Sequence, residues 1–428
     1  MKAIRNGLIT SLILILLMTT LGYGAVKPSD SSDFDDYLAT LTLSQKRLVK
    51  VFESLNLLED LSEEDTLIIA ATGDIMFHKP QMTSAYDTTA HTYNFYPPFE
   101  QIAPYIRSAD YALANFETTT SGSEYDFSGY PAFNAPDETL DAIKSAGFDY
   151  LSTANNHAFD RKLDGVYRTL EQMDVRGFDH GGTYMSTDSE KRYIIKEVKG
   201  FKLGILSLTY GLNGFEKAFD AETLYKNVNL ITPDANPDFI ETQLKMMESE
   251  GLDSSIVFIH WGNEYQLEPN EEQVALAHNM IEWGADIILG SHPHVIQKSE
   301  IVTYQGEDKY IIYSMGNFIS NQNRKTLTSI KNAKYTEDGV MIFLTLARNE
   351  FKQPYLKSVK HIPTWVYRYP SGGKTQYQIV PTIEYLPPEN PDYEIPKNIT
   401  DASVQKQILE SYHQSKTKLL DYPQTVIE

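Results

Sequence analysis

The 428-residue sequence has no cysteine. This absence excludes disulfide bonds, metal sites built from thiolates and a lipid-modified cysteine at the N-terminus. The folded chain must therefore be stabilised by core burial. Hydrophobic residues make up 41% of the sequence, which is enough for a sizeable core in a chain of this length.

Basic residues are also in short supply. Lys and Arg total 37 against 58 Asp and Glu, which gives a formal net charge of -21. Because phosphate backbones are bound by basic patches, this balance argues against nucleic acid as a main partner. The sequence also lacks a Gly-rich loop of the Walker type, and so gives no sign of ATP-driven ligation.

The N-terminal 27 residues carry Lys2 and Arg5, followed by an apolar run that continues to Leu21. This layout is typical of an export signal. Two alternatives stay open, a signal peptide cleaved near Gly24 and an uncleaved membrane anchor. In both cases we expect an exported protein, either anchored at the outer face of the cell membrane or secreted.

Beyond this segment the sequence pattern divides the chain into four parts. Residues 28–65 are acidic and polar with one helical stretch, and predict a spacer. Residues 66–335 alternate short apolar runs with helical patterns, which favours an α/β domain. Residues 336–390 predict a β-rich extension of the same domain, and residues 391–428 predict a helical tail.

Nearly every predicted strand of the α/β region ends in a polar side chain. The carboxyl ends of strands form the ligand crevice of open α/β sheets, so we expect these side chains to converge. Carboxylate, amide and imidazole groups together are typical ligands of divalent transition metals. Any one of these residues is as readily explained by a structural role as by metal binding. Their repetition at successive strand ends, however, predicts a metal site. The residues are Asp74, Asn115, Glu117, Asn155, Asn156, His157, His260, Glu264, His292, His294 and Asn317.

The two histidines of GSHPHVIQ, residues 290–297, close this series. We expect Gly290 to give the chain room to turn after its strand. Pro293 should restrict His292 towards extended backbone and so help to fix the directions of both imidazoles.

Six motifs in order resemble those of the CapA/PgsA-type poly-γ-glutamate capsule biosynthesis proteins, within the calcineurin-like metallophosphoesterase superfamily. They are TGDIMF, ANFET, TANNHAFD, IHWGNEY, GSHPHVIQ and YSMGNFI, and the similar region runs from about Leu67 to Ser320. The resemblance implies a four-layered α/β/β/α metallophosphoesterase-like sandwich with a C-terminal β-rich appendage. It also implies that the protein is attached at the outer face of the cell membrane. One or two divalent ions (Mn, Fe or Zn) are implied as cofactors.

The same resemblance implies roles for individual residues. Asp74, Glu117, Asn156, His260, His292 and His294 match metal ligands, with Glu117 in the place of a bridging aspartate. His157 matches the histidine that contacts the leaving group. Independently of the resemblance, Asp160, three residues after His157, is a second candidate catalytic residue: it orients that imidazole, pairs with it as an acid, or instead caps the following helix.

The sequence departs from the superfamily pattern at two ligand positions, Glu117 and Met76. Met76 stands where a histidine is expected, and His78, two residues later, is a candidate substitute. Three roles stay open for Glu264: a partner of His260, a general base, or a solvated loop residue. If the chain is an enzyme, the resemblance implies a metal-dependent hydrolase.

Three functions follow as hypotheses. The first is a surface-anchored component of poly-γ-glutamate synthesis or export that works with membrane-bound capsule synthase subunits. The second is an extracellular hydrolase of phosphoesters or γ-glutamyl amides, and the third is a non-catalytic scaffold of a synthase complex. A net charge of -21 disfavours a polyanionic substrate unless metals and residues such as Lys298, Arg324 and Lys325 make the crevice locally positive.

Overall fold

The computed structural model describes residues 43–55, 65–231, 238–386 and 399–423. The predicted export segment, residues 1–27, lies outside these ranges, as does most of the predicted spacer. Among the helices in the described ranges, none combines the length and the apolar character needed to cross a bilayer.

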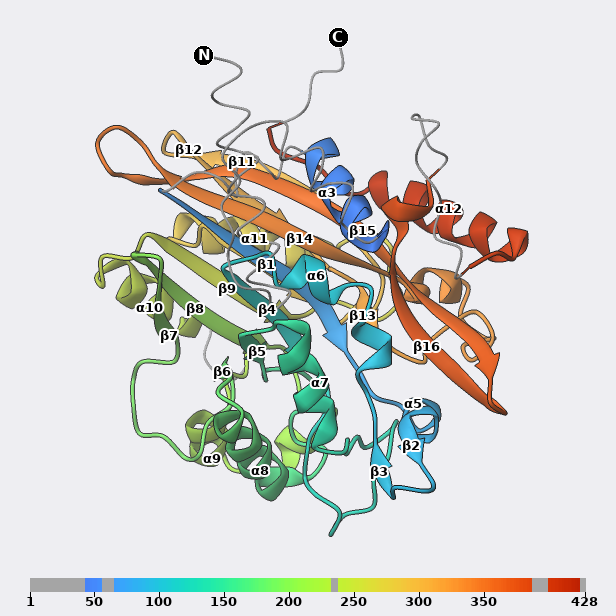
Figure 1. Ribbon diagram of the computed structural model, residues 1–428. Helices are drawn as coiled ribbons and strands as arrows, with labels where there is room; N and C mark the ends of the chain where they lie inside the picture. The colour runs from blue at the N-terminus through green and yellow to red at the C-terminus, as the bar shows by residue number, and fades with distance from the viewer. Residues whose placement is uncertain (1–42, 56–64, 232–237, 387–398, 424–428) are drawn as a thin grey trace.

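Two β-sheets form the centre of the molecule (Figure 1). The first has the strand order β16-β15-β14-β1-β4-β5-β6, and β13 pairs with β1 beside this path. The neighbours from β1 to β6 are parallel, whereas β14, β15 and β16 are antiparallel. The strands are β1 Thr66–Ile75, β4 Tyr111–Phe116, β5 Tyr150–Ser152, β6 Asp179–Gly181, β13 Asn317–Ile319, β14 Asp338–Arg348, β15 Pro354–Ser371 and β16 Lys374–Pro381.

The second sheet has the order β11-β12-β10-β9-β8-β7. Its four central strands are parallel, and an antiparallel strand closes each edge. The strands are β7 Ile194–Val198, β8 Phe201–Thr209, β9 Ser254–His260, β10 Ile287–Ser291, β11 Ser299–Tyr304 and β12 Glu307–Ile312. A separate two-stranded ribbon joins β2 Tyr86–Asp87 to β3 Thr92–Tyr93.

The apolar residues of the central strands point alternately into two different cores, because successive side chains of a strand face opposite sides. In β1, Ile69 packs between the two sheets, while Ile68 packs under the helices on the outer face. In β9, Phe258 joins the core between the sheets, while Val257 packs against helices on the other side. The fold is therefore the predicted α/β/β/α sandwich.

Helices cover both outer faces of the sandwich and the region beside the site (Figure 1). Those packed on the first sheet are α3 Leu43–Ser54, α5 Lys79–Ala85, α6 Ala103–Ile106 and α7 Glu138–Ala146, and those on the second are α10 Phe239–Glu248 and α11 Glu271–Glu282. The others are α8 Lys162–Val175, α9 Ala221–Asn227, α12 Ala402–Lys416 and the short 3-10 helices η1 Pro97–Phe99, η2 Phe215–Ala218, η3 Ala333–Glu337 and η4 Thr382–Tyr385.

Helix α3 belongs to the predicted spacer, yet it packs on the domain. Its residue Phe52 is buried and makes edge contacts with the rings of Tyr105, at 5.6 Å, and Phe343, at 6.0 Å. This part of residues 28–65 therefore contributes to the core on the outer face of the first sheet.

Gly290 is required by a close approach of two backbones, and not by the turn expected from the sequence. It lies within strand β10, and a Cβ atom added there would meet the carbonyl oxygen of Tyr313 at 2.0 Å. Gly73 of β1 is constrained in the same way, since its Cβ would lie 1.9 Å from the carbonyl oxygen of Gly316. Both glycines let neighbouring chain segments meet just before the strand ends.

We expect Gly290→Ala to lower the free energy of unfolding by about 3 kcal/mol or more, because the added methyl group overlaps backbone that cannot move aside. The matched control is Gly211→Ala, since a Cβ at Gly211 meets nothing within 4 Å. Chemical denaturation of both variants measures the difference. Equal stabilities of the two variants would contradict the close-approach argument.

Asp338 gives the fold a specific pH dependence. This carboxyl group accepts hydrogen bonds from Ser411 Oγ and Gln414 Nε2 of α12, and burial raises its pKa from 3.8 to about 8. Because the folded state holds the proton more tightly, this group makes the folded state less stable as pH rises from about 4 to 8. Asp338→Asn should flatten that decline, as measured by thermal denaturation at pH 5, 7 and 9. An unchanged pH profile would rule out Asp338 as its source.

Candidate metal centre

The six predicted ligands converge where strands of both sheets end. Asp74 is the penultimate residue of β1, Glu117 follows β4, His260 ends β9, and His292 follows β10. Parallel pairing brings these ends together, since Asp74 is opposite Asn115 and Ser291 is opposite His260. All six side chains are buried: Asp74, Glu117, Asn156, His260, His292 and His294.

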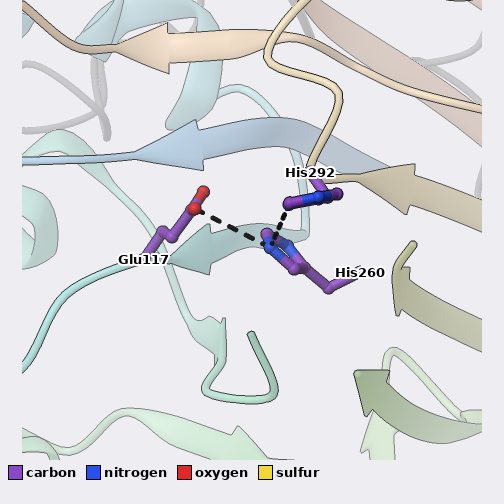
Figure 2. A group of neighbouring side chains, drawn as sticks. All are labelled: Glu117, His260 and His292. Carbon is purple, nitrogen blue, oxygen red and sulfur yellow. Dashed lines mark hydrogen bonds and ion pairs between the residues drawn. The ribbon is translucent and has the colours of Figure 1, made fainter. Parts of the chain in front are cut away.

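The carboxylate of Glu117 lies at the centre of the group, and among the residues that the structure describes neither of its oxygens has a hydrogen-bond partner. Its Oε1 atom is 3.7 Å from the Nε2 atoms of both His260 and His294. Figure 2 shows the side chains of Glu117, His260 and His292 pointing towards one another. A buried carboxylate without a partner costs several kcal/mol, so Glu117 is tolerated there only when it is protonated or faces a cation.

The spacing of these donors fits a cation. Nitrogen–oxygen separations of 3.7 Å are too long for hydrogen bonds. They are close to the roughly 3.5 Å between two ligands that each lie about 2.1 Å from one tetrahedral ion. Two triplets, Glu117–His260–His292 and Asp74–Glu117–His294, have ligand atoms within 4.8 Å of one another, and Glu117 belongs to both. The residues present therefore fit one or two divalent ions.

The inner cluster, defined as Glu117, Asn156, His260 and His292, is rich in nitrogen donors. His260 Nε2 lies 3.1 Å from His292 Nδ1 and 3.0 Å from Asn156 Oδ1. The other ring nitrogen of His260 lies 3.0 Å from Ser291 Oγ, which fixes the orientation of the ring.

The outer cluster, defined as Asp74, Glu117 and His294, lies beside a cavity. Asp74 Oδ2 is 3.1 Å from His294 Nδ1, and Asp74 Oδ1 accepts a hydrogen bond of 2.8 Å from Asn115 Nδ2. Asn115 Nδ2 is also 3.3 Å from His260 Nδ1, so this amide connects the two clusters.

Without a bound cation, the surroundings favour the uncharged forms of Glu117, His260 and His292. Burial, followed by the charges of Asp74 and Glu264, raises the pKa of Glu117 well above its usual value. Burial and the neighbouring imidazoles lower the pKa values of His260 and His292 well below theirs. A divalent cation would reverse the preference of Glu117, because it favours the ionised carboxylate.

Met76 and His78 do not supply the ligand that the superfamily pattern expects. The sulfur of buried Met76 accepts a hydrogen bond of 3.8 Å from Ser320 Oγ. His78 Nδ1 accepts one of 3.4 Å from the Asn321 backbone N–H, and burial and His294 lower the pKa of His78 to about 3. Within the described ranges, His78 belongs to none of the candidate ligand triplets.

His157 and Asp160 form a buried pair at the edge of the centre. Asp160 Oδ2 lies 2.8 Å from His157 Nδ1 and accepts a 2.6 Å hydrogen bond from the Phe133 backbone N–H. The alternative role of Asp160 as a helix cap is not seen, since α8 begins at Lys162 without a side-chain cap. The Phe133 ring lies edge-on to the imidazole at 4.6 Å. Asp160 therefore orients His157.

A cavity of about 270 Å³ adjoins both the outer cluster and this pair. It is large enough for a short segment of a substrate but smaller than typical drug-binding clefts. Its lining residues are Met76, His78, Tyr130, His157, Glu264, Tyr265, His294, Asn321, Gln322, Thr326 and Leu327.

The expectation that Pro293 holds His292 in extended backbone is wrong. His292 has a φ of 98° and His294 a φ of 59°, a region that few non-glycine residues adopt. The ring contacts of His292 hold this conformation, because Nδ1 contacts His260 while Nε2 lies 2.9 Å from the Tyr210 hydroxyl. Such backbone strain persists only where surrounding contacts over-determine it.

The sequence reasoning missed Tyr210 and Asn213, which follow strand β8. Tyr210 contacts His292, and Asn213 Oδ1 accepts a 3.2 Å hydrogen bond from Asn156 Nδ2. The sequence carries the signal, since Tyr210 and Asn213 come directly after the apolar run LGILSLT of residues 203–209. Glu264, predicted as a partner of His260, instead has Oε1 3.9 Å from His294 Nε2.

The chain is similar to known capsule proteins. It is 31% identical to "Capsule biosynthesis protein CapA" of Bacillus anthracis over 271 residues, which cover 61% of each protein. It is 33% identical to "PGA biosynthesis protein CapA" of Bacillus subtilis (strain 168) over 227 residues, 52% of this chain and 57% of that protein. The chain thus spans about three fifths of the length of these relatives.

Among solved structures, the chain is similar to the calcineurin-like phosphoesterase YfkN from Bacillus subtilis. The sequence identity is 15% and the TM-score 0.38, with 82% of this chain and 98% of that chain covered. At this score the likeness adds nothing to the fold described above.

The family model for "Bacterial capsule synthesis protein PGA_cap" matches residues 68–322, which hold all six predicted ligands and both residues of the His157–Asp160 pair. This region is more than half of the 428 residues. The chain therefore belongs to the bacterial capsule synthesis protein family PGA_cap.

Proposed function

We propose that this protein is a metal-dependent hydrolase that acts on poly-γ-glutamate, or on an anionic intermediate of its synthesis, during capsule formation at the outer face of the cell membrane. The observation that carries the proposal is the Glu117 carboxylate, buried without a partner between two imidazoles. A pure scaffold has no use for a group whose burial costs several kcal/mol, whereas a metal centre requires it.

Divalent ions held by the inner and outer clusters would supply a hydroxide nucleophile at neutral pH and polarise an acyl or phosphoryl oxygen. Asn156, His260 and His292 would hold the inner position, and Asp74 and His294 the outer one, with Glu117 shared. The Tyr210 hydroxyl at His292 and the Ser291 hydroxyl at His260 orient the ligand rings.

His157 is positioned to give a proton to the leaving group. Asp160 holds Nδ1, so the Nε2 atom is available for exchange with a substrate in the cavity that His157 lines. The buried Phe133 ring contacts the imidazole edge-on and helps to hold it in place.

The attraction for an anionic polymer must come largely from bound cations. Two of the basic residues expected to make the crevice positive are paired with acids. Arg324 forms two 3.0 Å contacts with the Glu337 carboxylate, and Lys298 lies 3.8 Å from Glu300. Lys325, next to the lining residue Thr326, is exposed and is the remaining candidate from that set.

The capsule context rests on family membership and on the names of the two Bacillus relatives. It supports membrane-bound synthase subunits as partners, and the sequence of residues 1–27 supports attachment through that segment. A hydrolase without a capsule role is the second candidate, because the ligand set favours hydrolysis whatever the substrate.

The purified protein should contain one to two equivalents of Mn, Fe or Zn, and chelation should lower its melting temperature. Glu117→Gln should lose the metal, yet unfold at a higher temperature than the chelated wild type, because it no longer buries a carboxylate. Elemental analysis and thermal denaturation measure both effects. If the purified wild type contains no metal and its melting temperature does not change when a chelator is added, the metal centre is excluded.

His157→Gln should reduce kcat by about 10²–10⁴-fold while leaving the metal content intact, because it removes a general acid and no ligand. Cleavage of an aryl phosphodiester and of poly-γ-glutamate, assayed in parallel, distinguishes the substrate classes. His278→Gln, at an exposed position of α11 near Glu300, is the matched control. If both variants cleave at the wild-type rate, His157 is not the proton donor.

A further inference from the structure

Glu264 lies at the mouth of the cavity, in the loop that follows β9. Its side chain is 42% exposed, yet Oε1 is 3.9 Å from His294 Nε2. With His292 and His294 it forms a third set of potential ligands whose atoms lie within 4.8 Å of one another. His294 Nε2 thus lies between two carboxylates, the buried Glu117 at 3.7 Å and the accessible Glu264 at 3.9 Å.

The loop around Glu264 is fixed to the segment that carries the two histidines. Tyr265 has a φ of 65°, and its backbone N–H donates a 2.8 Å hydrogen bond to the Pro293 carbonyl, between His292 and His294. Asn332 Nδ2 donates a second 2.8 Å hydrogen bond to the Tyr265 carbonyl. A strained residue held by two hydrogen bonds gives Glu264 a defined place despite its exposure.

The outer cluster needs a further donor. Asp74, Glu117 and His294 provide three, and the Met76 side chain on the same cavity offers a thioether, which binds hard divalent ions poorly. Glu264 lines this cavity too. Its own candidate ligand set is with His292 and His294, so it reaches the outer cluster through His294, whose Nε2 atom lies 3.9 Å from Glu264 Oε1.

We infer that Glu264 is the fourth ligand of the outer position and that it makes the two positions chemically different. The outer set would hold three carboxylates and one imidazole, which suits Mn²⁺. The inner set, with two imidazoles, one amide and the shared carboxylate, suits Zn²⁺ or Fe²⁺. Because Glu264 is 42% exposed and the inner cluster is buried, an ion at the outer position would be the more accessible to solvent. This inference rests on the proposed metal centre.

The test is a Mn²⁺ titration of the full-length protein loaded with one equivalent of Zn²⁺, followed by electron paramagnetic resonance and calorimetry. The wild type should bind one Mn²⁺, and Glu264→Gln should weaken that binding at least tenfold without loss of Zn²⁺. Glu264→Asp should restore part of the affinity. The control is Glu268→Gln, which removes the same charge from the same loop, where Glu268 interacts with Lys418.

Each result has one meaning. Mn²⁺ binding by Glu264→Gln equal to that of Glu268→Gln would overturn the role of Glu264 and leave the proposed hydrolase intact. Failure of the wild type to bind either metal would overturn both. Loss of Zn²⁺ together with Mn²⁺ in Glu264→Gln would place Glu264 at the inner position and overturn the assignment.

Discussion

The uncompensated carboxylate of Glu117 is the constraint on which the rest of the site depends. It is buried where strands from the two sheets end, and two imidazoles face it at distances suited to shared coordination and not to hydrogen bonding. The polar groups around it hold the facing side chains in place. Asn115 connects the two clusters, and Ser291 and Tyr210 fix ligand rings. His292 and His294 both have positive φ values, a strained backbone conformation that orients their imidazole rings in the site.

Much of this arrangement could be predicted from the sequence, and the reason is geometric. Short apolar runs predicted strands buried on both faces, and β1 and β9 confirm this by sending alternate residues into different cores. Parallel strands bring their carboxyl ends to one edge, so Asp74, Glu117 and His260 could be placed together without coordinates. The ligand roles of these residues stay a prediction.

The remaining features depended on contacts that sequence spacing does not encode. The conformation of His292 follows from its contacts with His260 and Tyr210, which outweigh the local preference imposed by Pro293. A glycine is required at position 290 because the backbone of Tyr313 lies against it, although the two residues are not close in sequence. Helix α3 joins the core through Phe343, which lies in a strand at the other end of the chain.

The position of β1 between β4 and β14 also bears on how the site is assembled. Strand β1 carries Asp74, and its antiparallel neighbour β14 lies more than 250 residues later in the sequence. Contacts of such long range form slowly, since the intervening chain must first be ordered. Strand β1, which carries Asp74, is therefore paired on both sides only after the C-terminal strands have been made. If the centre binds metal as proposed, the ion is acquired in the compartment in which the whole chain folds.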